Sequence, residues 1–386
     1  MVRQLAGLIE SRFQSPLRTP RTAAILGAAL GVSFAVCFAT GLLSHLVQDS
    51  SGWFRLPARP AGFYRVTQGL HVATGIATIP LLLAKLWSVF PKLFEWPPVR
   101  SGAHALERLA ILPLVGGSLF LLVSGVGNID RYRPWAFDFR SAHYAIAWIT
   151  IGALVVHLGA KWSTTRDSLR RPSDERTRSG HVALAVNSTT RRTFIGSAFG
   201  VSALLTLVTV GQTFAPLRKL ALLAPRRPDI GPQGFPVNRT AAAAGTDTID
   251  IDAYRLVIDG PLVDQRLELS YAELASMPQR SATLPIACVE GWSTTQTWTG
   301  VRFGELLARA GVRSDVHCTV HSIQTRGLSR SAPVNASQAA DADTLVALRV
   351  NGDMLAADHG FPVRLIGPNR PGVHQTKWLG RVEVHG

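Results

Sequence analysis

Five long apolar runs constrain the fold of this chain more than any other feature. Each holds about 20 residues with almost no charge, which is long enough to cross the hydrocarbon core of a bilayer as a helix. They lie near 22–47, 64–90, 105–127, 141–162 and 194–216. We therefore expect an all-α bundle of five transmembrane helices, with the lipid bilayer as a partner.

The positions of the arginines predict how these helices are oriented. Lys and Arg number 40 against 25 Asp and Glu, and a net charge of +15 could by itself indicate nucleic acid or an anionic membrane as the partner. Four arginines lie in the N-terminal tail and seven in the loop 163–193. Such basic segments stay on the cytoplasmic side. We therefore expect a multi-pass protein of the cell membrane with a cytoplasmic N-terminus, everything after about 217 extracytoplasmic, and no nucleic-acid partner.

Changes in composition along the chain predict a multi-domain protein. We expect a four-helix membrane domain over 1–165, a basic cytoplasmic loop over 166–193 and a fifth transmembrane helix over 194–216. A linker rich in Pro, Gly and Ala follows over 217–248. Strand-like runs such as "YRLVIDG" and the helical run "RFGELLARAG" then predict a folded α+β domain over 249–386.

Histidines within the apolar runs predict an outer haem site. Polar groups inside a membrane are costly and are usually kept for a function. His143 and His157 are 14 residues apart on one predicted helix, so they differ by about 40° in azimuth and about 21 Å in height. Such spacing suits a helix that supplies one ligand to each of two stacked haems. The second helix brings His71 to the outer level, where we pair it with His143.

The inner site is less complete. His157 needs a partner at the cytoplasmic level, and His104 is the only candidate. His45, at the outer end of the first helix, could compete with His71. An interhelical hydrogen bond or an interfacial side chain is the alternative for each of these histidines. The arrangement over 20–165 resembles the membrane cytochrome b subunits of bacterial formate dehydrogenases and nickel-iron hydrogenases, and more loosely the prokaryotic cytochrome b561 group. The resemblance implies one or two b-type haems.

A basic motif precedes the fifth apolar run. The stretch "TTRRTFIGSAFG" places Arg191 and Arg192 just before Phe194 and Ile195. It resembles a twin-arginine export signal, which moves domains that have already folded around a cofactor. The alternative is a simple positive-inside anchor, which needs only the arginines.

The three cysteines predict different roles. Cys37 falls in the first apolar run, whereas Cys288 and Cys318 lie in the soluble domain and could form one disulfide in an oxidising compartment. Alternation in "VHCTVHS" places Cys318 on one face with Val316 and Val320, as a small buried hydrophobe. Cys288 ends a predicted strand before a turn, where a thiolate could be presented to a soft metal ion.

Two long motifs then indicate a family. The stretch "CVEGWSTTQTWTGVRFGELLARAGV", which starts at Cys288, and the later "DTLVALRVNGDMLAADHGFPVRLIGPNRPGVHQTKWLGRVEV" resemble the core of the sulfite oxidase and periplasmic methionine-sulfoxide reductase family of molybdopterin enzymes. The resemblance covers about 234–385. It implies an α+β fold of the sulfite oxidase type, a molybdopterin-dependent oxidoreductase, and Cys288 as the catalytic molybdenum ligand.

The same resemblance implies a set of residues that bind the pterin or its phosphate. They are Asn238, Arg239, His359, Arg364 and Lys377. An anionic, phosphate-bearing cofactor requires fixed cations and N–H groups, so these residue types make physical sense. The alternatives are solvated surface charges for Arg364 and Lys377 and ordinary hydrogen-bonded histidines for His359 and His374. We expect Trp292 and Trp298 to serve core packing rather than chemistry.

Two departures from the family limit the choice of substrate. Leu328 stands where sulfite oxidases have an active-site tyrosine, and His374 stands near the position of an arginine. Without that phenol and guanidinium, sulfite itself becomes a doubtful substrate. The chain ends at Gly386 without the dimerisation domain of sulfite oxidases, so we expect a monomer.

These observations combine into one functional hypothesis. We expect a single-chain enzyme in which b-type haem passes electrons between quinone or quinol and the molybdopterin centre, which transfers an oxygen atom to or from a small-molecule oxo substrate. Resemblance to two-component periplasmic methionine-sulfoxide reductase systems favours reduction of S-oxides. The alternatives are an oxidase of a sulfite-like substrate, or a haem-binding electron carrier or sensor whose molybdopterin-like domain is inactive.

Overall fold

The computed structural model describes most of the chain in two compact units. The described residues are 15, 17–49, 54–97, 99–132, 134–170, 190–313, 315–327 and 329–385. One unit consists of Met1–Ala39 with His71–Val208, and the other of Thr40–Leu70 with Thr209–Gly386.

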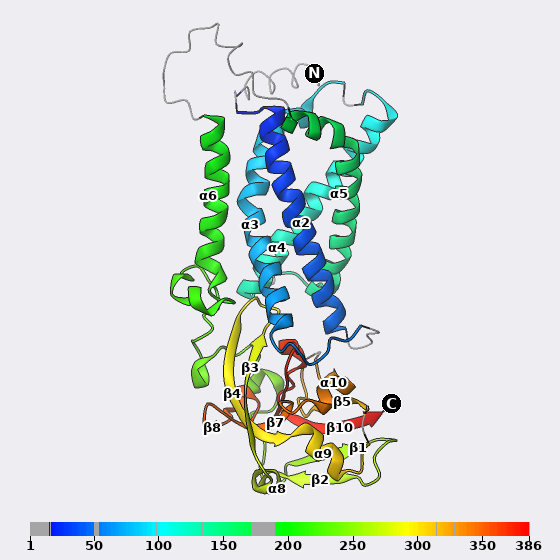
Figure 1. The fold of residues 1–386 in the computed structure, drawn as a ribbon, viewed down its shortest axis with the longest axis vertical. Coiled ribbons are helices and arrows are strands. Elements are labelled where there is room, and N and C mark those ends of the chain that lie inside the picture. Colours follow the sequence, from blue (N-terminus) through cyan, green and yellow to red (C-terminus); the bar gives the residue numbers. More distant parts are fainter. Residues whose placement is uncertain are drawn as a thin grey trace. The chain divides into compact units, whose positions relative to one another are not determined.

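Five long helices build the first unit and the segments that join it to the second. They are α2 (Pro20–Gln48), α3 (Phe63–Val89), α4 (Gly102–Asp130), α5 (Phe139–Arg170) and α6 (Arg191–Val210), with the short η1 (Phe90–Phe94) after α3. Figure 1 shows the long helices running side by side. All five are long and apolar enough to cross a membrane. The predicted number of apolar helices is thus confirmed among the described residues.

Small and hydroxyl-bearing side chains hold the helices together. Ser33 Oγ lies 2.7 Å from Thr78 Oγ1, and Ser202 Oγ donates to the Ala77 carbonyl at 2.6 Å. Such contacts between helices are typical of membrane bundles, where burial of apolar surface drives little association. Large apolar side chains such as Leu112, 78% exposed, point outward. An outward apolar surface suits a lipid environment.

Two helix ends differ from those expected from hydropathy. Helix α5 continues to Arg170, and α6 stops at Val210, before the end of the apolar run. After α6, the Gly211 α-carbon packs so closely on the Leu217 carbonyl that an added side chain would collide with it. The next two residues, Gln212 and Thr213, bond to residues 291–293 of the second unit. The chain therefore leaves the helix because of tertiary contacts, which hydropathy does not report.

The second unit is built on two sheets. One has the order β2-β1-β10-β5-β6, and the other the order β3-β4-β7-β8, with β9 paired to β7. Among the described strands, β1 and β10 pair in parallel and the other pairs are antiparallel. The strands are β1 (Arg255–Asp259), β2 (Leu267–Ser270), β3 (Arg280–Ala287), β4 (Ser293–Arg302), β5 (His317–Ser322), β6 (Ser331–Val334), β7 (Leu345–Val350), β8 (Asp353–Met354), β9 (Arg364–Ile366) and β10 (Leu379–His385).

Short helices connect these strands and precede them. They are η2 (Ala215–Leu220), η3 (Pro232–Gly234), α7 (Ala241–Ala244), α8 (Tyr271–Ser276), α9 (Phe303–Arg309), α10 (Ala336–Ala340), η4 (Ala357–His359) and η5 (Gly372–His374). Helix α8 starts with a capping box, in which Ser270 Oγ accepts from the Glu273 N–H while the Glu273 side chain accepts from the Ser270 N–H. The structure therefore has the expected combination of apolar helices and a sheet-containing domain.

Alternation along the strands explains the two cores. On β5, Cys318 and Val320 are buried while His317, Thr319 and His321 are more exposed, as the sequence pattern predicts. Cys318 belongs to the core of the first sheet. Trp298 on β4 and Ile366 on β9 belong to the core of the second sheet. Strand β3 of this second sheet ends at Ala287, and the sheet thereby fixes the position of the next residue, Cys288.

Candidate active site

Cys288 lies at the turn that joins β3 to β4. Its N–H donates to the Trp292 carbonyl at 2.9 Å, and the Gly291 N–H donates to the Cys288 carbonyl at 3.0 Å. Gly291 has φ of +85°, a left-handed conformation that glycine adopts without steric cost. The turn is therefore fixed by its own backbone, and the Cys288 side chain, 3% exposed, is held at the end of the sheet.

A second loop closes against this turn. Pro371 forms a bridge with Ala287, the residue before Cys288. A Cβ atom added to Gly372 would lie 2.8 Å from the Ala287 carbonyl oxygen, too close for any side chain. Glycine at position 372 thus permits the close approach of backbone to backbone beside the cysteine.

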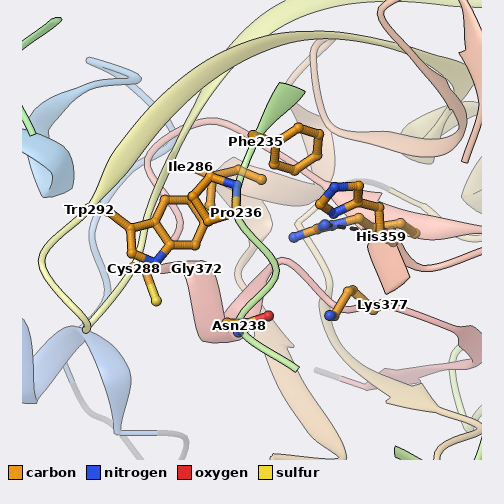
Figure 2. Close-up of a pocket in the computed structure, with 10 residues that line it drawn as sticks. Phe235, Pro236, Asn238, Ile286, Cys288, Trp292, His359, Gly372 and Lys377 are labelled. Atoms are coloured by element: carbon orange, nitrogen blue, oxygen red, sulfur yellow. Dashed lines mark hydrogen bonds between the residues drawn. The ribbon is translucent and has the colours of Figure 1, made fainter. Parts of the chain in front are cut away.

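The two loops help to line a pocket that holds most of the predicted site residues. Figure 2 shows Cys288 and Trp292 at one side of the pocket, His359 and Lys377 at the other, and Asn238 between them. The lining residues are Phe235, Pro236, Asn238, Ile286, Cys288, Trp292, His359, Arg364, Gly372 and Lys377. Segments far apart in the sequence thus place a thiol, an amide and three basic side chains around one cavity.

Arg364 is the most deeply buried cation of the pocket. Its Nη1 donates to the His359 carbonyl at 3.1 Å, and its guanidinium lies 5.2 Å from the centre of the Trp298 ring. Its Nε is buried without a hydrogen-bond partner. Burial lowers the pKa of Arg364 to about 9. A buried cation with an unpaired N–H group is costly unless an anion joins it.

Lys377 and His359 complete the basic wall. Lys377 Nζ donates to the carbonyls of Arg239 at 2.5 Å and Asp358 at 2.9 Å, and burial, helped by the charge of Arg364, lowers its pKa to about 7. His359 donates from Nε2 to the Pro232 carbonyl at 2.7 Å and stacks on Phe235. Burial lowers the pKa of His359 to about 4, so it is neutral at pH 7. Nδ1 of His359 is left as an acceptor.

This chemistry fits an anionic, metal-bearing cofactor such as molybdopterin. The unpaired Nε of Arg364 and the ammonium of Lys377 suit a phosphate, and Cys288 offers a sulfur donor for a soft metal. Burial, followed by the negative charge of Glu290, raises the pKa of the Cys288 thiol. The thiol therefore keeps its proton at neutral pH until a bound metal displaces it.

Two other residues singled out in the sequence lie outside the pocket lining, and a third lies outside the described residues. Arg239 does not line the pocket, because its Nη2 donates to the Ala243 carbonyl at 2.7 Å and only its carbonyl meets Lys377. His374 is buried outside the pocket lining, and its carbonyl accepts from Arg370 Nη2 at 2.7 Å. Leu328 lies outside the described residues.

Sequence reasoning missed some of the lining. Phe235 and Pro236 begin the stretch "FPVNRT", which also contains Asn238, and that proximity was the available signal. Trp292 and Trp298 are both buried in the core of the second sheet, as predicted. Trp292 also lines the pocket and donates from Nε1 to Glu290 at 3.1 Å, which was not predicted from the sequence.

The structure rules out the disulfide alternative. Cys288 and Cys318 are both free. They belong to different hydrophobic cores, one under each sheet. A disulfide needs α-carbons within about 7 Å and β-carbons that face each other, so residues in separate cores do not form one without backbone movement. The reading of Cys288 as half of a disulfide is therefore wrong.

The helices bring His71 and His143 together as a second candidate site. Their ring centroids are 6.3 Å apart. His71 Nδ1 donates to the Cys37 carbonyl at 2.8 Å, and His143 Nδ1 lies 3.1 Å from Ser124 Oγ. Each ring is thus oriented through Nδ1, as metal-binding histidines commonly are, which leaves Nε2 for a ligand. Two metal–imidazole bonds of about 2 Å would place the ring centres roughly 6 Å apart. The observed separation would therefore allow the two rings to hold one metal ion between them.

His104 and His157, the two histidines predicted for the inner site, are not brought together in the same way. His104 Nδ1 accepts from the Arg100 N–H at 3.1 Å at the start of α4. His157 has a buried, unpartnered Nδ1 and interacts electrostatically with Lys85, Glu107 and Lys161. No ring contact between His104 and His157 is recorded within the described part of the helices, so their pairing stays a prediction. His45 lies in the last turn of α2.

Comparisons with known proteins agree with the chemistry of the pocket around Cys288. Residues 243–386 match the family model described as "Oxidoreductase molybdopterin binding domain". Mitochondrial sulfite oxidase of Rattus norvegicus is 33% identical over a match that covers 35% of this chain and 30% of that protein. The uncharacterized oxidoreductase YuiH of Bacillus subtilis is 29% identical, covering 35% of this chain and 66% of that protein. The NADH nitrate reductase of Volvox carteri is also 29% identical, over 34% of this chain and 18% of that protein.

One solved structure shows a partial likeness. The sulfane dehydrogenase SoxCD of Paracoccus pantotrophus aligns with a TM-score of 0.33 and 24% identity, over 36% of this chain and 39% of that one. The chain spans 30% of the length of the rat sulfite oxidase that it matches. Residues 243–386 are therefore a molybdopterin-binding domain of the oxidoreductase type, and they are similar in sequence to sulfite oxidase.

Proposed function

We propose that this protein is a membrane-bound molybdenum oxidoreductase that uses quinol, through b-type haem, to reduce an S-oxide-like substrate at a molybdopterin centre. The observation that carries the proposal is the pocket in which Cys288 faces the basic side chains Arg364 and Lys377. The five apolar helices and the His71–His143 pair add the membrane and haem parts. In this proposal, quinol in the bilayer supplies the electrons, and the molybdopterin centre uses them for oxygen-atom transfer.

Each residue of the pocket has a role in this proposal. Cys288 gives up its proton and ligates the metal as a thiolate. Arg364 and Lys377 hold the cofactor's phosphate, while Asn238 and the Nδ1 acceptor of His359 orient its polar groups. Arg239 acts indirectly, because its carbonyl fixes the Lys377 ammonium. The metal supplies two-electron oxygen-atom chemistry, which amino-acid side chains do not provide.

The net reaction balances without a further reactant. A quinol loses two electrons and two protons and becomes a quinone. The S-oxide gains two electrons and two protons, its S–O bond breaks, and the oxygen leaves as water. Haem carries one electron at a time, so it bridges the two-electron metal centre and the quinol. His71 and His143 would hold the outer haem, and His157 with His104 remains the proposal for a second, inner haem.

The reductase direction follows from the combination of parts in one chain. A haem-bearing membrane domain joined to a molybdopterin domain resembles the two-component periplasmic methionine-sulfoxide reductases. Oxidation of a sulfite-like substrate is the second candidate, favoured by the 33% identity to a protein named sulfite oxidase. His374, buried outside the pocket lining, does not supply the guanidinium that a small dianion would use. The reductase is therefore the first choice.

Location and assembly complete the proposal. We propose that the chain lies in the cell membrane as a monomer, with a cytoplasmic N-terminus and the molybdopterin domain outside. Arg191 and Arg192 begin α6, where they act as a twin-arginine signal that exports the domain after its cofactor is loaded.

One preparation tests the whole proposal. The full chain, purified in detergent, is assayed for molybdenum, pterin and haem per chain, and then reduced with a quinol analogue. We expect stoichiometric molybdenum, a haem spectrum reduced by the quinol analogue, and haem reoxidation by methionine sulfoxide. Haem without molybdenum would instead support an electron carrier or sensor. Haem reduction by sulfite, without reoxidation by the S-oxide, would reverse the proposed direction.

A further inference from the structure

Asn369 bonds the connection between α2 and α3 to the molybdopterin domain within the second unit. It is 2% exposed and has φ of +52°. Its N–H donates to the Ala61 carbonyl at 3.0 Å, and its Nδ2 donates to the Pro57 carbonyl at 2.7 Å. Its Oδ1 accepts from the Tyr64 N–H at 2.8 Å. One buried side chain and its own backbone thus satisfy three polar groups of the segment 57–64.

Further contacts fix the same connection. They are Asn335 Nδ2 with the Leu56 carbonyl at 2.9 Å, Ser337 Oγ with the Ala58 N–H at 3.1 Å, and Arg59 with Asp341 at 2.9 Å and Asp343 at 2.5 Å. These bonds differ in kind, from buried amide contacts to exposed ion pairs. The segment 56–64 is therefore held firmly on the domain by several independent contacts.

Tyr64 and Asn369 both lie close to the segments that carry Cys288 and Gly372. Gly372, three residues after Asn369, lines the pocket together with Cys288. The side chain of Tyr64, 1% exposed, packs in one apolar cluster with Ala287, the residue before Cys288. Tyr64 is thus linked through its backbone to Asn369, three residues before Gly372, and shares an apolar cluster with Ala287, the residue before Cys288.

Helical spacing relates Tyr64 to His71, one of the two histidines proposed to bind haem. Tyr64 and His71 both belong to α3. Seven residues of α-helix correspond to about 10 Å of rise and to a rotation only about 20° short of two full turns. Both side chains therefore leave the same face of one helix, two turns apart, and the first of them is the residue bonded to Asn369.

We propose that electrons pass from α3 to the molybdopterin domain at the Tyr64–Asn369 contact, with Asn369 as the positioning residue. The proposal rests on the proposed function, because it assumes haem on His71 and molybdenum on Cys288. The two electrons are those released from quinol and consumed at the S-oxide, transferred one at a time. Asn369 makes no contact with substrate. It holds the first residues of α3 against the loop that precedes Gly372, both within the second unit, and electron transfer slows as the gap between a donor and an acceptor widens.

Two matched variants isolate this role. Asn369→Gly removes the side-chain bonds to Pro57 and Tyr64 but keeps the left-handed backbone, which glycine adopts freely. Asn351→Gly is the control, because Asn351 has φ of +54°, lies in the same domain and is exposed. Its side chain bonds to Gln233, Gln296 and Thr297 and to no part of the segment 57–64 that the structure describes.

Three measurements are made on the full chain in detergent. Haem reoxidation after mixing reduced protein with methionine sulfoxide is followed by stopped-flow absorbance. Turnover with reduced viologen supplies electrons to the molybdenum centre from solvent. Hydrogen exchange at Tyr64 and its neighbours reports the contact in cofactor-free protein. For Asn369→Gly we expect several-fold slower haem reoxidation, unchanged viologen turnover and faster exchange. Asn351→Gly should match the wild type in all three.

Each other outcome overturns the proposal. An unchanged rate of haem reoxidation in Asn369→Gly would show that electron transfer to the molybdenum centre does not depend on this contact. Equal losses of quinol-driven and viologen-driven turnover would show a structural effect on the molybdenum site instead. If Asn369→Gly does not retain molybdenum, Arg59→Gln loosens the same connection from its exposed rim, and normal haem reoxidation in that variant would reject the proposal. Wild-type protein without haem or molybdenum would instead refute the proposed function.

Discussion

Cys288 and Cys318 are both free thiols, and each is buried in the core under a different sheet. Burial raises the pKa of both, that of Cys318 to about 12. The two cysteines nevertheless differ in their surroundings, because only Cys288 lines the pocket with the basic side chains. Cys318 therefore serves core packing, whereas the pocket around Cys288 is the basis for proposing that residue as the metal ligand.

Replacement of Cys288 by serine should abolish turnover while the fold persists. Serine keeps nearly the same volume, but a hydroxyl does not replace a thiolate as the donor to a soft metal. We expect a fall in viologen-driven S-oxide reduction of at least about 100-fold, the scale on which altered metal-site residues act. Circular dichroism and pterin content should stay near wild type. Cys318→Ser, as the control, should retain turnover; full activity in Cys288→Ser would contradict the assignment.

Replacement of Arg364 by methionine should separate stability from cofactor binding. Arg364 is a buried cation with an unpartnered Nε, so an apolar side chain of similar length relieves a desolvation cost. We expect the cofactor-free domain to gain about 1 kcal/mol, which corresponds to a rise of roughly 2–4 °C in its melting temperature. Pterin retained through purification should fall. Arg349→Met, at an exposed position of β7, should change neither quantity.

The neutral, buried His359 predicts a loss of stability in acid. Its folded pKa of about 4 lies below the ordinary value of 6.5, so the unfolded chain binds more protons between these values. The free energy of unfolding of the cofactor-free protein should therefore fall as the pH drops through this window, by up to about 3 kcal/mol from this residue. Denaturant titrations give the free energy of unfolding of wild type and of His359→Gln at each pH, and the two free energies should converge toward pH 4. An identical pH slope in both would show that His359 is not the cause.

Loss of either outer histidine should remove one haem. His71 and His143 lie at a ring separation that suits a shared iron, whereas His45 lies at the end of α2. We expect the low-spin haem spectrum of the outer site to be absent in His71→Ala and in His143→Ala and retained in His45→Ala. Haem measured per chain by pyridine extraction provides the stoichiometry. A haem loss confined to His45→Ala would transfer the ligand role to that residue.

Local features of this chain were predictable because they depend on near neighbours in sequence. The apolar runs indicate helices through their own composition, and the alternation around Cys318 indicates its inward face on β5. The motif after Cys288 and the positions of Asn238, His359, Arg364 and Lys377 pointed to one site, and the structure gathers them around one pocket. Arg239 was the exception, since its side chain is held by Ala243.

Tertiary contacts decided the rest. The separation of His71 and His143 depends on how α3 packs against α5, which no spacing along one helix reports. The end of α6 at Val210 depends on Gln212, whose carbonyl accepts from the Ser293 N–H at 2.8 Å. The attachment of the segment 57–64 to Asn369 joins residues some three hundred positions apart. Sequence determined which groups are available, and long-range hydrogen bonds and packing determined which of them meet.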